Sequence, residues 1–205
     1  MRLFLSHAWR ADCLGRDTHA RVRTLNRALR RRGVDTWFDE DEMHGDIDAA
    51  MALGLEGSDV VVVLLTRAYA DKVATAALDP RARDNCYKEC SFACTNTKVC
   101  LPVVFEPCMR DVSSWPSVVR LYFGSKLYVD GVGDDPDALA DAVLRMMRRS
   151  GIKDAPRVAP LPRRSVRAMP RPPTRVAPLL RRRCLRPPRR QAPVLGRPPV
   201  ATVFL

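Results

Sequence analysis

The stretch Asp59-Val60-Val61-Val62-Val63-Leu64-Leu65-Thr66 contains six consecutive large aliphatic residues. β-branched residues favour strands, and an unbroken apolar run of this length indicates a strand that is buried on both faces. Strands of this kind are typical of parallel sheets that helices cover on both sides. The stretch therefore predicts the central strand of a parallel sheet, and with it the class of the fold.

Segments of strand and helix character alternate around this stretch. Further strands are predicted at residues 2–6, 34–38, 99–105 and 126–129. Helices are predicted at about residues 18–32, 48–55, 85–97 and 136–149, whereas a long connection is expected at residues 67–83 and an irregular segment at residues 106–119. This alternation predicts an α/β fold, a three-layer, doubly wound, five-stranded parallel sheet. The flavodoxin-like strand order 2-1-3-4-5 is the common solution for five such units.

An acidic segment follows the predicted second strand. Five carboxylates fall within the eight residues Asp39–Asp46, and Gly45 supplies a turn. Asp46 or Asp48 can cap the next helix, because the side-chain oxygen of an N-cap residue accepts a backbone N–H. The segment lies at the carboxyl end of a strand, where open α/β sheets place their sites. The alternative is a solvated acidic turn, which is the usual role of a charge run.

The net positive charge of the chain comes from its last quarter. Residues 1–155 carry a formal charge of −1, whereas residues 156–205 contain 13 arginines, 12 prolines and no acid. Such a composition cannot bury an apolar core and predicts disorder. The chain is therefore divided into a folded domain, residues 1–152, and an Arg/Pro-rich disordered tail, residues 153–205. The tail could bind anions non-specifically, but no specific nucleic-acid or membrane partner is expected.

The cysteines indicate a reducing compartment rather than a metal centre. Cys86, Cys90 and Cys94 follow helical spacing and lack the CxxC pairs that zinc sites favour, so no metal site is predicted. The number of cysteines is odd, and no secretory or membrane-spanning segment is recognised. These features predict reduced thiols and a cytoplasmic location.

Six segments, in the same order along about residues 1–150, resemble the sequence motifs of the TIR (Toll/interleukin-1 receptor) domain family. They are the first-strand box Phe4-Leu-Ser-His7, the second strand with its BB loop at Trp37–Asp46, the third strand followed by Tyr69, the helix start Cys86-Tyr-Lys-Glu89, the fourth strand at Leu101–Val104, and Trp115. The helix start departs from the family pattern, because Asn85 stands where the family commonly has Trp. The resemblance implies the parallel α/β fold and a signalling module.

The resemblance also implies an activity. In catalytic TIR domains the glutamate of this helix start supports cleavage of NAD⁺, so Glu89 becomes the candidate catalytic residue. Breaking the nicotinamide–ribose bond builds positive charge on the sugar, as in glycoside hydrolysis, and a nearby carboxylate stabilises that charge. NAD⁺ is then the substrate, no cofactor is expected, and the products are nicotinamide and ADP-ribose or its cyclised form. The alternative is that Glu89 only stabilises the helix start.

Further candidate contacts to NAD⁺ lie in the loops around the expected crevice. They are His7, Trp9, Arg10, Asp39, Tyr69 and Asn85. Trp9 or Tyr69 could replace the ring that Asn85 lacks, and Arg10 could meet the pyrophosphate, although each could also serve only its loop. Nothing in the sequence resembles a P-loop, a GxGxxG fingerprint or a nucleophile elbow, which excludes a Rossmann-type site and a serine hydrolase of that kind.

The acidic segment is also the candidate partner-binding surface, since TIR domains associate with one another. The predicted partner-binding residues are Glu40, Asp41, Glu42, Met43, His44, Gly45 and Asp46. Such a loop would complement the Arg-rich helix predicted at residues 18–32 of a second molecule. A head-to-tail contact of this kind forms open filaments. The sequence therefore predicts an NAD⁺ glycohydrolase that acts on self-assembly or, alternatively, a non-catalytic TIR–TIR interaction scaffold.

Overall fold

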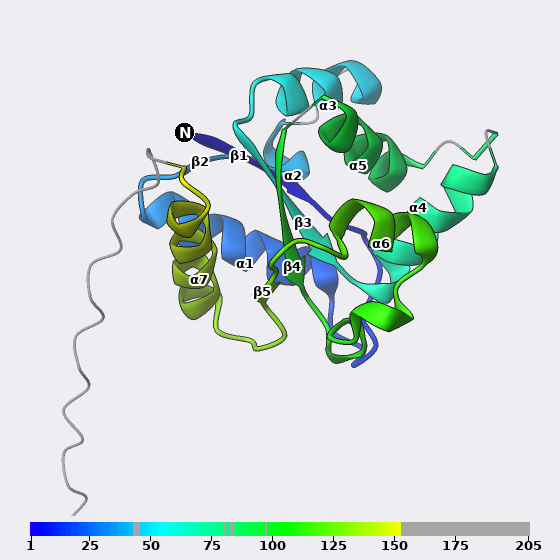
Figure 1. The fold of residues 1–205 in the computed structure, drawn as a ribbon. Coiled ribbons are helices and arrows are strands. Elements are labelled where there is room, and N and C mark those ends of the chain that lie inside the picture. Colours follow the sequence, from blue (N-terminus) through cyan, green and yellow to red (C-terminus); the bar gives the residue numbers. More distant parts are fainter. Residues whose placement is uncertain (43–45, 80, 83, 97, 153–205) are drawn as a thin grey trace, which may run out of the picture. The chain divides into compact units, whose positions relative to one another are not determined.

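The computed structural model describes residues 1–42, 46–79, 81–82, 84–96 and 98–152. Five strands form one parallel sheet in the order β2-β1-β3-β4-β5 (Figure 1). Their bounds are β1 (Arg2–Ser6), β2 (Asp35–Trp37), β3 (Val60–Leu65), β4 (Val99–Val104) and β5 (Val129–Asp130). The predicted class and strand order are confirmed. The tail, residues 153–205, lies outside the described residues.

The central strand β3 is buried along its whole length. It pairs with β1 on one side and with β4 on the other, and all six of its residues have no exposed surface. Val60, Val62 and Leu64 point into one apolar cluster, whereas the alternate residues point into a second cluster on the opposite face. Because successive side chains of a strand point to opposite faces, a strand covered on both sides requires an unbroken aliphatic run.

Helices cover both faces of the sheet (Figure 1). The apolar cluster on one face is completed by α1 (Thr18–Arg31) and α7 (Pro136–Arg149). The cluster on the other face is completed by α3 (Ile47–Glu56), α4 (Arg67–Leu78), α5 (Asn85–Thr95) and α6 (Ser117–Phe123). A short helix, α2 (Asp39–Glu42), follows β2, and two 3₁₀ turns, η1 (Pro107–Met109) and η2 (Val112–Ser114), precede α6.

Side-chain caps explain where most of these helices begin. Asp17, Asp46 and Asp84 accept backbone N–H groups at the starts of α1, α3 and α5, and Asp46 is one of the two caps predicted for its helix. Asp135 does the same for α7, where Pro136 occupies the first helical position. Each such cap satisfies a donor that would otherwise lack a partner within the helix and contributes roughly 1 kcal/mol.

Several predicted boundaries are wrong. The long connection predicted at residues 67–83 contains α4, and the irregular segment predicted at residues 106–119 contains the two 3₁₀ turns and the start of α6. The acidic residues 39–42 form α2 rather than a loop. The fifth strand is Val129–Asp130 rather than residues 126–129, because only these two residues pair with β4.

Candidate functional site

Glu89 lies in the second turn of α5 and reaches the carboxyl end of β1. Ser6, the last residue of that strand, donates a hydrogen bond from Oγ to Glu89 Oε2 over 2.6 Å. Glu89 keeps part of its surface exposed. A partly accessible carboxyl group therefore stands at the edge where open parallel sheets bind their ligands.

A buried tyrosine, Tyr69, contacts Ser6 and so supports the pair of Ser6 and Glu89. The hydroxyl of Tyr69 lies 2.8 Å from Ser6 Oγ and 3.3 Å from the carbonyl oxygen of Cys86. Burial raises the pKa of Tyr69, so the phenol stays a neutral donor that can donate to Ser6 while Ser6 donates to Glu89. Tyr69 has no exposed surface, so its ring offers a substrate no contact in this conformation. Its role here is to position Ser6.

The environment of Glu89 favours its protonated form. Desolvation by the surrounding protein raises the pKa of Glu89 to about 8, and the hydrogen bond from Ser6 opposes that shift. The negative charges of Asp39 and Asp84 raise the pKa further, while Lys72 lowers it. A cation placed beside the carboxyl group would lower the pKa again and restore the carboxylate. The site is therefore suited to a positively charged ligand.

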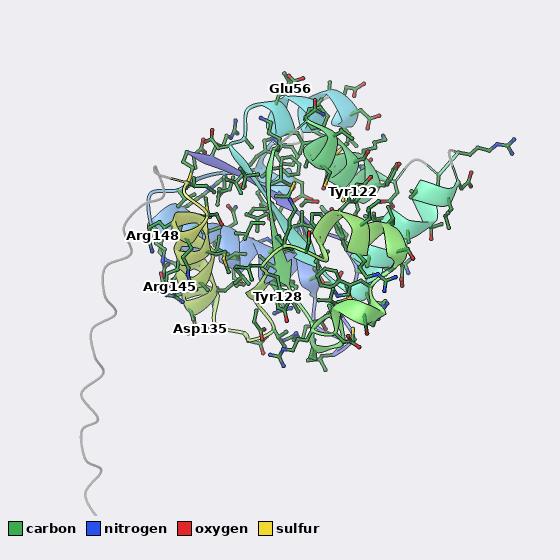
Figure 2. All side chains as sticks on the ribbon, in the orientation of Figure 1. Glu56, Tyr122, Tyr128, Asp135, Arg145 and Arg148 are labelled. Atoms are coloured by element: carbon green, nitrogen blue, oxygen red, sulfur yellow. The ribbon has the colours of Figure 1, made fainter. Side chains whose placement is uncertain are left out.

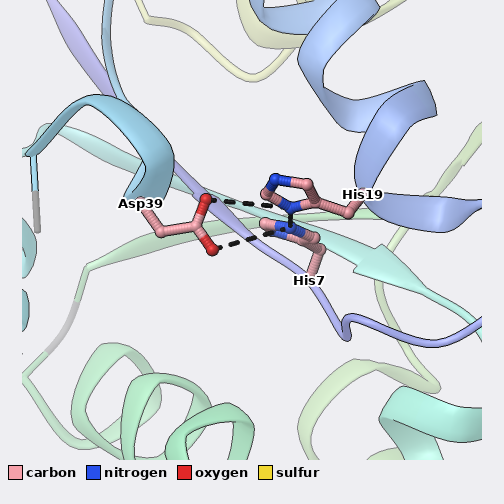
Figure 3. Close-up of side chains that lie close together, drawn as sticks. All are labelled: His7, His19 and Asp39. Atoms are coloured by element: carbon pink, nitrogen blue, oxygen red, sulfur yellow. Dashed lines mark hydrogen bonds and ion pairs between the residues drawn. The ribbon is translucent and has the colours of Figure 1, made fainter.

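His7, His19 and Asp39 form a cluster next to this edge (Figure 3), and Trp9 contacts it. His7 Nε2 lies 2.7 Å from His19 Nδ1, and Trp9 donates from Nε1 to Asp39 Oδ2 over 2.7 Å. The Trp9 ring stacks on His19 with ring centroids 3.9 Å apart, yet 62% of Trp9 remains exposed. Burial lowers the pKa of His7, although Asp39 opposes this, and the imidazole is neutral at pH 7. The cluster thus presents one exposed aromatic ring above buried polar groups.

The remaining predicted substrate contacts lie at the border of the site. Arg10 lines a cavity of 280 Å³ together with Lys72 and Asp84. Asn85 is exposed as the first residue of α5, one turn before Glu89. The structure thus groups Glu89 with Ser6 and Tyr69, sets the cluster around Asp39 next to them, and leaves these two residues at the surface.

The two largest cavities given by the described residues lie elsewhere. One of 460 Å³ separates α1 from the connection between β5 and α7, and one of 610 Å³ lies between β5 and α7. Tyr128, Arg145 and Arg148 line the second, and Figure 2 shows the two arginines on α7. Neither cavity is lined by a predicted NAD⁺ contact. Size alone is therefore a poorer guide here than the perturbed carboxyl group at the end of the strands.

The acidic residues of α2 face α1, the Arg-rich helix, of the same chain. Arg23 donates from Nε and Nη2 to the two carboxylate oxygens of Glu40, and Arg30 Nη1 lies 2.9 Å from Asp41 Oδ2. Asp46 caps α3 by accepting from the backbone N–H of Ala49. The other predicted partner contacts, the side chain of Glu42 and residues 43–45, lie outside the described part of the chain. The charge complementarity predicted between two molecules thus exists within one.

Two members of the site were not assigned from the sequence. Ser6 belongs to the quoted first-strand box, and its place as the last residue of a strand was the available signal for a site role. His19 lies in the first turn of α1, where nothing in the sequence indicates that it contacts His7. Its position follows only from the packing of α1 against the sheet, which brings both rings together.

The strand order, the acidic segment after β2 and the glutamate on α5 define a small α/β module. A family model described as TIR domain matches residues 3–144, so the chain belongs to this family. TIR domains work in signalling through interactions with other TIR domains, and this chain shares that role. A comparison with curated proteins finds no match. Within the described residues, no helix has the length and apolar character needed to cross a membrane.

Proposed function

We propose that this TIR domain cleaves the bond between nicotinamide and ribose in NAD⁺, with Glu89 as the catalytic residue. The observation that carries this proposal is the position of Glu89. Its carboxyl group is partly accessible, lies at the carboxyl end of β1, and is held there by Ser6. The raised pKa of Glu89 marks a group whose surroundings disfavour a lone negative charge and favour a bound cation, as expected for a functional site.

The chemistry needs one carboxylate. When the C–N bond breaks, its electron pair leaves with nicotinamide, which departs as a neutral molecule and needs no proton. The ribosyl group becomes an oxocarbenium-like cation, which Glu89 stabilises more strongly than it stabilises the ground state. Water then adds to the cation and loses a proton, so NAD⁺ and water give nicotinamide, ADP-ribose and H⁺. A cyclised product forms if an atom of the substrate replaces water.

The neighbouring residues suit subsidiary roles in this proposal. The exposed face of Trp9 can stack on a planar base, and its N–H holds Asp39 in place. Arg10, which lines a cavity with Lys72 and Asp84, is the proposed contact to the pyrophosphate. The six cysteines that the structure describes are free thiols, which supports the cytoplasmic location that we propose and its supply of NAD⁺.

The test is nicotinamide release by concentrated, purified full-length protein. Wild type is compared with Glu89→Gln, which keeps the shape and the acceptor for Ser6 but removes the charge. Glu56→Gln is the matched control, since Glu56 is an exposed glutamate at the end of α3 (Figure 2). We expect Glu89→Gln to lose at least ~100-fold in rate and Glu56→Gln to match wild type. Absence of release by wild type, or equal rates for Glu89→Gln, overturns the proposal.

The alternative function is a TIR–TIR scaffold without turnover, and the ion pairs between α1 and α2 favour it. Glu40 and Asp41 are paired at the surface with arginines that a second molecule could replace. If so, Arg23→Ala frees Glu40 and increases self-association at low salt. Arg27→Ala is the control, because Arg27 is an exposed arginine of the same helix, and it should leave self-association unchanged. Sedimentation at several protein concentrations measures this. Unchanged association in Arg23→Ala counts against the acidic segment as the contact surface.

A further inference from the structure

The cluster of His7, His19 and Asp39 has a feature that NAD⁺ cleavage does not require. One ligand atom from each residue lies within 4.8 Å of the other two (Figure 3). His7 Nε2 lies 2.7 Å from His19 Nδ1 and 3.7 Å from Asp39 Oδ2, and His19 Nδ1 lies 4.0 Å from Asp39 Oδ1. Three metal-binding groups from the end of β1, the start of α1 and the start of α2 therefore lie close together, with the two histidines facing different oxygens of Asp39.

We propose that His7, His19 and Asp39 form a binding site for a divalent ion of the zinc type. Zinc binds imidazole nitrogen and carboxylate oxygen at about 2.0–2.2 Å in tetrahedral geometry, which sets its ligand atoms about 3.3 Å apart. The two histidine nitrogens lie closer together than this, at 2.7 Å, whereas their distances to the Asp39 oxygens are longer, at 3.7 and 4.0 Å. Small side-chain shifts, with the two histidines moving apart and Asp39 moving in, complete the geometry. Three protein ligands leave the fourth position open for water.

The groups behind the ligands already have the arrangement that metal sites use. Ligating histidines usually donate their second N–H to a carbonyl or a carboxylate, which fixes the tautomer. His7 Nδ1 lies 3.1 Å from the carbonyl oxygen of Leu5, so Nε2 carries the lone pair that faces the cluster. His19 Nε2 lies 3.5 Å from Glu40 Oε1, and Trp9 donates to Asp39. His7 and Asp39 are therefore each oriented by an outer partner, and Glu40 lies where His19 would need one.

One buried nitrogen of the cluster, His19 Nε2, has no hydrogen-bond partner. With the proton of His7 directed at Leu5, a neutral His19 donates from Nδ1 to His7 Nε2, and its own Nε2 then carries no proton. A metal at Nδ1 reverses this assignment, because the proton moves to Nε2 and points at Glu40. No proton is gained or lost in this shift. Metal binding thus gives a partner to a buried nitrogen that otherwise has none.

Burial favours a resident ion over a loosely held one. His7 and His19 are 6% and 7% exposed, and the side chain of Asp39 is 11% exposed. A mixed nitrogen and oxygen donor set selects zinc-type ions, whereas Mg²⁺ prefers oxygen ligands alone. A second group, Cys13, Glu106 and Cys108, also brings ligand atoms within 4.8 Å, but both of its thiols belong to exposed cysteines. The test must separate these two groups.

The experiment titrates Zn²⁺, and Co²⁺ as its spectroscopic substitute, into metal-free full-length protein. We expect one ion per chain, the visible absorption of tetrahedral Co²⁺, and no competition from Mg²⁺. His19→Gln should weaken binding at least ~100-fold, since even outer partners of metal ligands contribute about 10–100-fold. His44→Gln, which removes the third histidine of the chain, and the pair Cys13→Ser/Cys108→Ser should bind as wild type does. NAD⁺ turnover is not measured, so the result is independent of the proposed function.

The proposal is overturned if wild type binds no Zn²⁺, if His19→Gln binds as tightly as wild type, or if the cysteine variant loses binding. Because His19 is buried, each variant is first checked by its thermal unfolding without metal. If His19→Gln does not fold, Glu40→Gln decides, since Glu40 is at the surface and touches only the outer nitrogen of His19 in this site. We expect Glu40→Gln to weaken binding about 10-fold, and unchanged affinity would overturn the proposal.

Discussion

At the scale of single residues, Glu89 combines two opposing influences. Desolvation holds its pKa at about 8, whereas the hydrogen bond from Ser6 favours the ionised form that the proposed chemistry requires. In the free protein at pH 7 most molecules therefore carry a protonated Glu89. Binding of the positively charged nicotinamide ring opposes the desolvation, so the substrate itself can promote ionisation of the catalytic group.

This balance predicts the pH dependence of the reaction. Because the carboxylate is the active form, kcat/KM should rise about 10-fold per pH unit below pH 8 and level off above it. Ser6→Ala removes the donor that stabilises the carboxylate, so its midpoint should lie at higher pH than that of wild type. Initial rates of nicotinamide release across this range test the prediction. A flat profile, or a fall with rising pH, would contradict the role given to Glu89.

The same group predicts how folding stability depends on pH. The pKa of Glu89 is about 8 in the folded chain against 4.5 as the ordinary value, so the folded protein binds more protons between these limits. Its contribution is therefore complete below about pH 4.5 and is lost as the pH rises through 8, by at most ~1.4 kcal/mol per unit. Glu89→Gln cannot ionise and should become more stable than wild type as the pH rises.

Urea unfolding of both proteins at several pH values measures this difference. Glu56→Gln serves as the control, because Glu56 is exposed and its removal should leave the pH dependence unchanged. The difference in unfolding free energy between Glu89→Gln and wild type should widen from pH 5 to pH 8. A constant difference across that range would show that Glu89 ionises at its ordinary pKa.

At the scale of helices and strands, α3 approaches the sheet closely at Gly54. A Cβ added there would clash with the Trp37 ring at Nε1, far inside contact distance. Trp37 cannot move away easily, because it is buried and stacks on Phe4 with ring centroids 4.3 Å apart. Gly54 lies within α3, where it lets the helix backbone pack on the Trp37 ring.

Gly54→Ala should therefore destabilise the protein, although alanine is the better helix former. The helix propensity of alanine contributes about 1 kcal/mol in favour of the variant. Overpacking against a fixed ring costs about 1–3 kcal/mol in a core, and a contact as short as this one belongs at the upper end. Urea unfolding measures the net loss. Gly133→Ala, where a Cβ meets nothing within 4 Å, is the control, and equal stability of the two variants would contradict the packing argument.

The elements differ in how much of them could be predicted from the sequence. The aliphatic run of β3 leaves no choice but a strand buried on both faces, and the aspartate caps fix the starts of α1, α3 and α5. α4 was missed because its buried face is built largely from Ala70, Val73 and Ala76, which give a weak apolar pattern. β5 was misplaced because two residues of pairing leave almost no periodicity. Where the buried side chains are small or the strand is short, the apolar pattern of the sequence carries little information.

The candidate site divides in the same way. Glu89 could be predicted because its motif is local and falls at the start of a helix. The contact between His7 and His19 could not, because it depends on how α1 lies across the end of β1 rather than on spacing along the chain. The pairing of Glu40 with Arg23 has the same origin. Local sequence therefore identifies single groups, and packing decides which of them meet.

At the scale of the whole domain, the first and last helices are joined on one face of the sheet by a partly buried ion pair. Arg32, at the end of α1, donates to Asp141 Oδ1 over 2.6 Å and to Asp137 Oδ1 over 2.7 Å, both on α7. Asp141 is 1% exposed, whereas one-fifth of the Arg32 side chain reaches solvent. Removing the arginine would leave a buried carboxylate without its cation, which is the costly way to break such a pair.

Arg32→Met should therefore lower the unfolding free energy by about 2–4 kcal/mol, somewhat less than for a fully buried pair because Arg32 is partly solvated. The double variant Arg32→Met/Asp141→Leu removes both charges and should regain most of that loss, since apolar residues of similar size can replace a buried pair. Arg31→Met is the control, because Arg31 is exposed and its pair with Asp137 lies at the surface, where the expected change is below ~1 kcal/mol. Urea unfolding of the four proteins measures all three effects. If the double variant is no more stable than Arg32→Met, the pair holds α1 against α7 by its specific geometry, and the isolated charge of Asp141 is not the source of the loss.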